Sequence, residues 1–117
     1  MWEGVDYLFI DKVSMIGSNF LLKISEALTE AKQSTKVSGG ISIIFDGNFA
    51  QLPPVGETQL YSYINTQKRK MGTKCGKDDV FGKSLWLSVK VVVILNELMR
   101  QSGPKIETFI KLLSWLR

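Results

Sequence analysis

Two short apolar runs, each followed by an aspartate, constrain the fold of this chain more than any other feature. Residues 5–11 read VDYLFID, and residues 41–46 read ISIIFD. Runs of this length and composition are typical of buried strands. Between them, apolar side chains recur at helical spacing, which predicts a helix over residues 19–34. A strand, a helix and a second strand in this order indicate an α/β fold with a parallel sheet.

The second half of the chain continues the alternation. Residues 47–60 contain two glycines and two adjacent prolines, which predicts a structured loop. A weaker pattern suggests a helix over residues 61–71. Residues 86–95 (WLSVKVVVIL) are rich in β-branched side chains and predict a third buried strand. Pro104 then stands at an early position of a predicted helix over residues 105–116.

Composition excludes several classes of site and protein. The 117 residues include one cysteine and no histidine, so a disulfide framework within the chain, an ordinary zinc site and histidine-based nucleophilic catalysis are excluded. No apolar run approaches the roughly 20 residues of a membrane span. The first residues lack a secretory signal pattern. We therefore expect an intracellular protein without a membrane association.

The net charge of +4 is unevenly distributed along the chain. Residues 68–83 contain six basic and two acidic side chains, and this segment is rich in glycine. Such a segment is typical of a solvated loop. It has two interpretations: a loop that follows a phosphate backbone, or an exposed insertion that keeps the protein soluble.

Chemically useful side chains follow each predicted strand. Asp11 ends the first strand, where a carboxylate can meet a metal–phosphate complex, although many strand ends carry such an acid. After the second strand, Gly47-Asn48 permits a tight turn, and Pro53-Pro54 stiffens the loop and is expected to turn the Gln51 amide inward, away from solvent. Arg100 follows the third strand and can contact phosphate, or is an ordinary surface residue. Because carboxyl ends of parallel strands share one edge, we expect Asp11, Asn48 and Gln51 to cluster there, with Arg100 farther away.

Together, these segments resemble the PIF-type DNA helicases of superfamily one. The resemblance rests on IDKVSM at residues 10–15, GNFAQLPPV at residues 47–55 and LMRQ at residues 98–101. The family motifs read I-D-E-x-S-M, G-D-F-x-Q-L-P-P-V and L-x-x-x-x-R-Q. Similar helicase genes occur in Helitron-type mobile elements. The resemblance covers nearly the whole chain and spans the interior of a helicase core.

The resemblance implies a partial RecA-like (P-loop NTPase) three-layer fold with a mainly parallel sheet. Residues 1–84 would form the back half of the first RecA-like domain, including a basic loop at 68–83. Residues 85–117 would form the end of that domain and the start of the second. The implied activity is ATP-driven movement on single-stranded DNA in the five-prime to three-prime direction, serving DNA repair, recombination and telomere maintenance in the nucleus or mitochondrion.

The resemblance also implies residue roles. Asp11 would hold Mg²⁺. Gln51 and Arg100 would act in catalysis and contact ATP, with Gln51 sensing the γ-phosphate and Arg100 stabilising its developing charge. Gly47 and Asn48 would complete the nucleotide-binding set.

Departures from the family pattern limit what this chain can do alone. Lys12 stands where the family has its catalytic glutamate, and a protonated lysine cannot accept a proton from the attacking water. Asn48 replaces the family's aspartate. No phosphate-binding G-x-x-x-x-G-K-[ST] motif is present. We therefore expect a catalytically dead fragment of a helicase. The alternatives are a non-catalytic module that binds single-stranded DNA, left from a mobile-element helicase, and a decayed remnant without activity.

Overall fold

The computed structural model describes residues 2–63, 74–97 and 106–115. Its element order is β1 (Tyr7–Ile10), α1 (Ser18–Ala31), β2 (Ser42–Phe45), α2 (Lys74–Leu87) and α3 (Ile106–Trp115). Two short 3-10 turns, Val13–Met15 and Val37–Gly40, flank α1 on either side. The predicted strands over residues 5–11 and 41–45 are confirmed with shorter bounds, and the predicted helix over residues 19–34 is confirmed but begins one residue earlier and ends three residues earlier. The predicted helix over residues 105–116 is confirmed for residues 106–115, and its two end residues lie outside the described residues.

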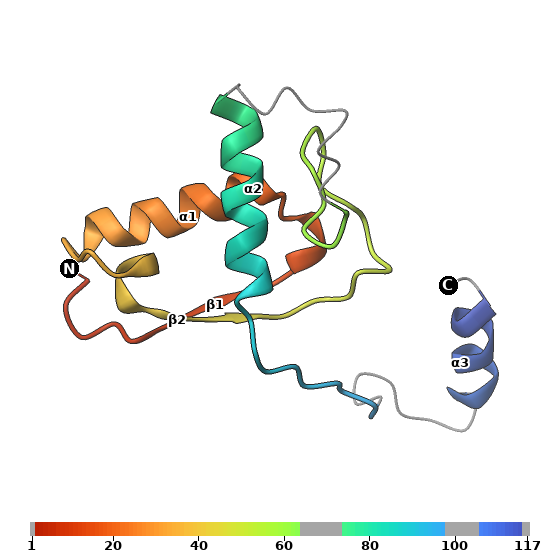
Figure 1. Ribbon diagram of the computed structural model, residues 1–117. Helices are drawn as coiled ribbons and strands as arrows, with labels where there is room; N and C mark the ends of the chain where they lie inside the picture. Colours follow the sequence, from red (N-terminus) through yellow and green to blue (C-terminus); the bar gives the residue numbers. More distant parts are fainter. Residues whose placement is uncertain (1, 64–73, 98–105, 116–117) are drawn as a thin grey trace.

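The two strands are parallel neighbours in one sheet. Tyr7 pairs with Ser42, and Ile10 pairs with Phe45. Alternate residues of each strand are half-buried, and those between them are exposed. The covered face carries Ile10 and Phe45, which pack on the core residues Val13, Ile16, Leu21 and Leu60. Helix α1 connects the strands and lies along this covered face (Figure 1).

The opposite face of the sheet is open. Tyr7, Phe9 and Ile44 point to this side, and their exposed fractions are 68%, 62% and 46%. Helices α1 and α2 both lie on the other side of the sheet (Figure 1). The part of the chain that the structure describes is therefore a two-layer α/β arrangement.

Helix α2 corrects two sequence predictions. Its range takes in residues 74–83 of the segment predicted as a solvated basic loop, so that prediction is wrong there. Asp79 and Lys83 are buried in this helix. Residues 68–73 lie outside the described residues, as does most of the helix predicted over 61–71. Residues 61 and 62 form a turn and a bend, and residue 63 belongs to no helix or strand.

The predicted third strand over residues 86–95 is also wrong. Trp86 and Leu87 end helix α2, and residues 89–97 belong to no helix or strand. Trp86 is held in the helix by edge-to-face contacts with Phe45 and Phe49, whose ring centroids lie 5.4 and 5.5 Å away. The β-branched run that follows has the composition of a strand, but the described sheet contains only β1 and β2.

No helix among the described residues combines the length and apolar character that crossing a bilayer requires.

Candidate functional site

The carboxyl ends of β1 and β2 bring the first two predicted segments together. Because Ile10 pairs with Phe45, the residues that follow each strand emerge at the same end of the sheet. The backbone amide of Asp46 donates to the Ile10 carbonyl at 2.8 Å, and that of Val13 donates to the Asp46 carbonyl at 3.0 Å. The expectation that Asp11 and the loop after residue 46 share one edge is confirmed, whereas the clustering of the Asp11, Asn48 and Gln51 side chains stays a prediction. We call this edge, residues 11–13 and 46–51, the rim.

Gly47 allows the two segments of the rim to pack backbone to backbone. Its φ of 148° lies in a region that favours glycine. A Cβ atom there would lie 2.9 Å from the Val13 nitrogen and 3.3 Å from the Lys12 Cα. The nucleotide-binding role assigned to Gly47 stays a prediction, and close packing gives an independent reason for a glycine at this position.

Asn48 organises the turn that leads to Gln51. Its side-chain oxygen accepts a hydrogen bond from the Ala50 amide at 2.9 Å, and its carbonyl accepts one from the Gln51 amide at 3.0 Å. This is the local turn chemistry that asparagine favours. The Gln51 side chain is exposed, so the expectation that Pro53-Pro54 keep it away from solvent is wrong. Its catalytic role stays a prediction.

Asp11 and Lys12 form an ion pair at the rim. The Lys12 amide donates to Asp11 Oδ1 at 2.7 Å, and Lys12 Nζ lies 3.3 Å from Asp11 Oδ2. Lys12 has a left-handed backbone conformation (φ 58°, ψ 46°). The hydrogen bond from the Lys12 side chain, followed by that from its amide, lowers the pKa of the Asp11 carboxyl.

We expect this pair to be visible in a titration of the carboxyl groups. In Lys12→Met the ammonium is lost, so the pKa of Asp11 should rise towards its ordinary value. Carbon-detected NMR of the side-chain carboxyl measures this pKa directly. A carboxyl whose pKa is lower in the folded state stabilises the fold at pH values above its pKa in the unfolded state. Any stabilisation from the pair is therefore lost as pH falls through the folded-state pKa of Asp11. Lys36→Met, which removes an exposed lysine just before the 3-10 turn that leads to β2, is the control. An equal rise of the Asp11 pKa in that variant would contradict the assignment.

A magnesium ion does not fit the described rim. Mg²⁺ requires near-octahedral oxygen coordination, but both Asp11 oxygens accept hydrogen bonds from Lys12, and the Asn48 side-chain oxygen accepts one from Ala50. Within residues 2–63, 74–97 and 106–115, no three or more histidine, cysteine or acidic residues form a group suited to a metal ion. The metal-binding role of Asp11 stays a prediction that this geometry opposes.

A buried polar cluster, which the sequence did not reveal, holds the far end of the loop after β2. Lys83 is 1% exposed, and its Nζ donates to the Ser62 carbonyl at 3.1 Å, the Ser62 hydroxyl at 3.0 Å and the Tyr63 carbonyl at 3.3 Å. The Ser18 hydroxyl donates to Asp79, and the Ser18 amide donates to the Thr58 carbonyl at 3.0 Å. We call Ser18, Asp79 and Lys83 the loop clamp, because they join residues 58–63 to α1 and α2.

Glu57 also attaches the loop after β2 to helix α1, close to the loop clamp. Its Oε2 accepts a hydrogen bond from the Phe20 amide at 3.1 Å, which satisfies one of the free N–H groups at the start of α1. The signal for the clamp was the spacing of Asp79 and Lys83, which places both side chains on one face of a helix. The glycines and charges of residues 68–83 favour a loop and so mask this helical spacing.

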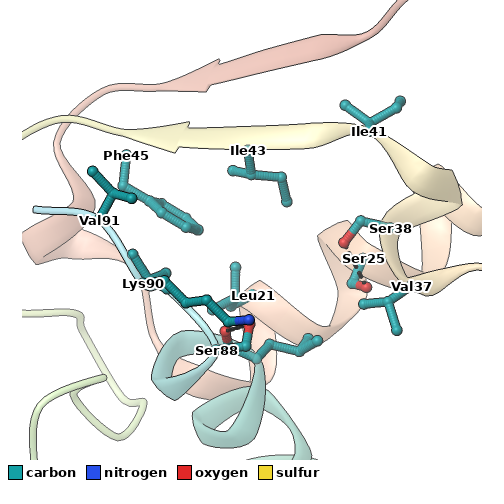
Figure 2. Close-up of a pocket in the computed structure, with 12 residues that line it drawn as sticks. Leu21, Ser25, Val37, Ser38, Ile41, Ile43, Phe45, Ser88, Lys90 and Val91 are labelled. Atoms are coloured by element: carbon teal, nitrogen blue, oxygen red, sulfur yellow. Dashed lines mark hydrogen bonds between the residues drawn. The ribbon is translucent and has the colours of Figure 1, made fainter.

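Neither Arg100 nor a cavity on the covered face of the sheet belongs to the rim as it is described. Arg100 lies outside the described residues. A cavity of about 350 Å³ lies on the covered face of the sheet, between α1, β2 and residues 88–91, with Val91 beside Phe45 (Figure 2). Asp11, Lys12, Gly47, Asn48 and Gln51 do not line it. In the described part of the chain, Asp11, Lys12, Gly47 and Gln51 are exposed.

Comparison with known proteins is consistent with the rim motifs. The model of the PIF1-like helicase family matches residues 1–117. The chain is 32% identical over 116 residues to the ATP-dependent DNA helicase PIF1 of Rattus norvegicus, a match that covers 99% of the chain and 16% of the relative. For the Candida albicans PIF1 helicase the identity is 29% over 120 residues, covering 99% and 12%. For the Saccharomyces cerevisiae helicase RRM3 it is 24% over 106 residues, covering 90% and 13%.

No solved structure matches the chain significantly. The chain spans 12 to 16% of the length of these curated relatives. The family match nevertheless extends over its whole length, and its rim carries the motif residues at adjoining strand ends. The chain belongs to the PIF1-like helicase family.

Proposed function

We propose that this chain is an interior part of an ATP-dependent DNA helicase, which couples ATP hydrolysis to DNA unwinding. In this proposal residues 1–84 form the back half of the first RecA-like domain. Residues 85–117 form the end of that domain and the beginning of the second. The three-layer architecture would then be completed by elements that cover the open face of the sheet.

One observation supports this proposal above the others. Two parallel strands end side by side, and the segments after them, IDKVSM and GNFAQLPPV, are joined by the hydrogen bond from the Val13 amide to the Asp46 carbonyl. In open α/β sheets, ligands bind beyond the carboxyl ends of the strands. The rim is therefore the place where a nucleotide phosphate would be met.

The proposed roles follow from this placement. Gln51 would contact the γ-phosphate and the attacking water, since an amide can donate to one and accept from the other. Arg100 would bind phosphate oxygens through its guanidinium group. ATP and Mg²⁺ would serve the intact helicase. Lys12 would leave this chain without a general base.

The biological setting is proposed from the relatives alone. The curated relatives are named as ATP-dependent DNA helicases. By extension, the intact helicase would move along single-stranded DNA. It would serve DNA repair, recombination and telomere maintenance in the nucleus or mitochondrion.

We expect this chain to hydrolyse ATP no faster than buffer does. It lacks a phosphate-binding loop and has Lys12 at the position of the family's catalytic acid. Phosphate release with magnesium-ATP and single-stranded DNA measures this. Turnover that Asp11→Ala abolishes would contradict the expectation.

A chimera tests the proposed role of the position that Lys12 occupies. This chain would replace the matching 116 residues of the rat PIF1 helicase, to which it is 32% identical. The chimera should bind DNA but not hydrolyse ATP, and Lys12→Glu should restore measurable hydrolysis, with Lys36→Glu as the control of equal charge change. A chimera that is active with Lys12 in place, or one that binds DNA but stays inactive with Lys12→Glu, would count against the proposed roles.

The alternative of a non-catalytic module that binds single-stranded DNA has separate support. Tyr63 is 98% exposed and Tyr61 is 49% exposed, and aromatic side chains of this kind can stack on bases. Lys74 and Lys77 are exposed on α2, whereas Lys83 is buried in the loop clamp and unavailable. Salt-dependent binding of an oligonucleotide by this chain alone, weakened by Tyr63→Ala, would favour this alternative.

A further inference from the structure

We infer that Lys12 acts as a built-in counter-cation for Asp11, so that this rim excludes the divalent metal ion that a helicase site of this type would take. The inference rests on the proposed function only in one respect, which is that the rim is where such a metal would be expected. The group that would take the place of the metal ion is the Lys12 ammonium, and the backbone around Lys12 holds it beside Asp11.

The first step is that three side-chain oxygens of the rim, two from Asp11 and one from Asn48, already accept hydrogen bonds. Asp11 Oδ1 is 2.7 Å from the Lys12 amide nitrogen, and Asp11 Oδ2 is 3.3 Å from Lys12 Nζ. The Asn48 side-chain oxygen is 2.9 Å from the Ala50 amide nitrogen. All three oxygens therefore accept hydrogen bonds from the chain itself, and the Lys12 ammonium is a cation already placed beside Asp11 Oδ2, so a metal ion would have to compete with it.

The second step is the backbone that holds Lys12 in place. With Lys12 in the left-handed conformation, its amide and its ammonium both reach the same carboxylate. The next residue is tied to the second strand by the hydrogen bond from the Val13 amide to the Asp46 carbonyl, and Gly47 packs directly against the backbone of residues 12 and 13. The ion pair is thus built on anchored backbone, although both side chains are exposed.

The third step is the charge at the rim. Asp11 and Asp46 contribute two negative charges, and Lys12 cancels one of them. Lys12→Met leaves both carboxylates uncompensated, and Lys12→Glu adds a third. Each change strengthens the attraction for a divalent cation, and at an exposed site a change of two unit charges is worth about tenfold in affinity.

The experiment is a Mn²⁺ titration of the full chain, followed through paramagnetic broadening of backbone amide signals. Mn²⁺ takes oxygen ligands as Mg²⁺ does. In the unaltered chain, the amides of residues 11–13 and 46–48 should broaden no earlier than those beside Glu26 and Glu30, two acids of helix α1. In Lys12→Glu the rim amides should broaden at a Mn²⁺ concentration lower by about tenfold. Lys12→Met should give a smaller shift in the same direction, and it provides the test if Lys12→Glu does not fold.

Lys36→Glu and Lys36→Met are the matched controls, because Lys36 is an exposed lysine that precedes β2 at its amino end. Early broadening at the rim of the unaltered chain would overturn the inference, as would equal shifts in the Lys36 variants or no shift in a folded Lys12 variant. The titration contains neither nucleotide nor DNA. Its result is therefore separate from the ATP hydrolysis test, and failure of the proposed function would leave it unchanged.

Discussion

Lys83→Met should lower the free energy of unfolding by about 3 kcal/mol. Lys83 is 1% exposed, and its ammonium donates to two carbonyls and a hydroxyl of residues 62 and 63. Methionine fills a similar volume but donates no hydrogen bond, so these part-buried acceptors would lose a charged donor whose own side chain is buried. Urea denaturation followed by circular dichroism measures the change.

Lys77→Met is the matched control for this prediction, because Lys77 is exposed on the same helix. It should change the free energy of unfolding by less than about 0.5 kcal/mol. Equal stability of the two variants would show that the loop clamp does not hold residues 58–63. Hydrogen exchange of the Ser18 amide, which donates to the Thr58 carbonyl, should accelerate in Lys83→Met but not in Lys77→Met.

Gly82→Ala should destabilise the fold by about 3 kcal/mol, although the same change inside a helix usually stabilises by about 1 kcal/mol. Helix α2 crosses the first turn of α1 at this residue. A Cβ at Gly82 would overlap the Ser18 carbonyl group and lie 3.1 Å from the Ser18 Cα. Because the atoms it meets belong to the backbone, the two helices would have to separate.

Ser84→Ala provides the comparison, since Ser84 is exposed two residues further along α2. It should leave the midpoint of thermal unfolding nearly unchanged, whereas Gly82→Ala should lower it by roughly 10 °C, given about 4 °C per kcal/mol for a chain slightly longer than 100 residues. A stabilised Gly82→Ala protein would mean that α1 and α2 do not cross at this point.

The parts of the fold that were predictable are those in which local pattern and tertiary environment agree. The strands at residues 7–10 and 42–45 are short apolar runs, and α1 has an apolar stripe that includes the buried Leu21 and Leu28. The position of Asp11 next to the loop after residue 46 followed from the parallel direction of two strands. No side-chain detail was needed for that step.

Helix α2 was missed because its local pattern opposes a helix. Its residues include Gly76, Gly82 and several charges, and its apolar side chains do not form a continuous stripe. The contacts that support it are distant in sequence: Gly82 meets Ser18, Lys83 meets Ser62, and Trp86 meets Phe45. Tertiary packing overrides helix propensity in such cases.

The Asp11–Lys12 pair was only half predictable. The sequence shows that a lysine replaces an acid, but not that its amide and ammonium both bind the neighbouring carboxylate. That geometry depends on the left-handed backbone at Lys12, a conformation that lysine rarely adopts and that no residue type in the segment indicates.

The exposed apolar run after α2 has a practical consequence for anyone handling this chain. Residues 91–95 (VVVIL) are uncharged, β-branched or aliphatic, and 76 to 83% exposed. Windows of five to seven such residues without proline are the recognised seeds of cross-β aggregation. In concentrated solution, copies of the isolated chain would therefore aggregate through this segment. A lysine placed within it would oppose aggregation, because its charge repels the same segment of another copy.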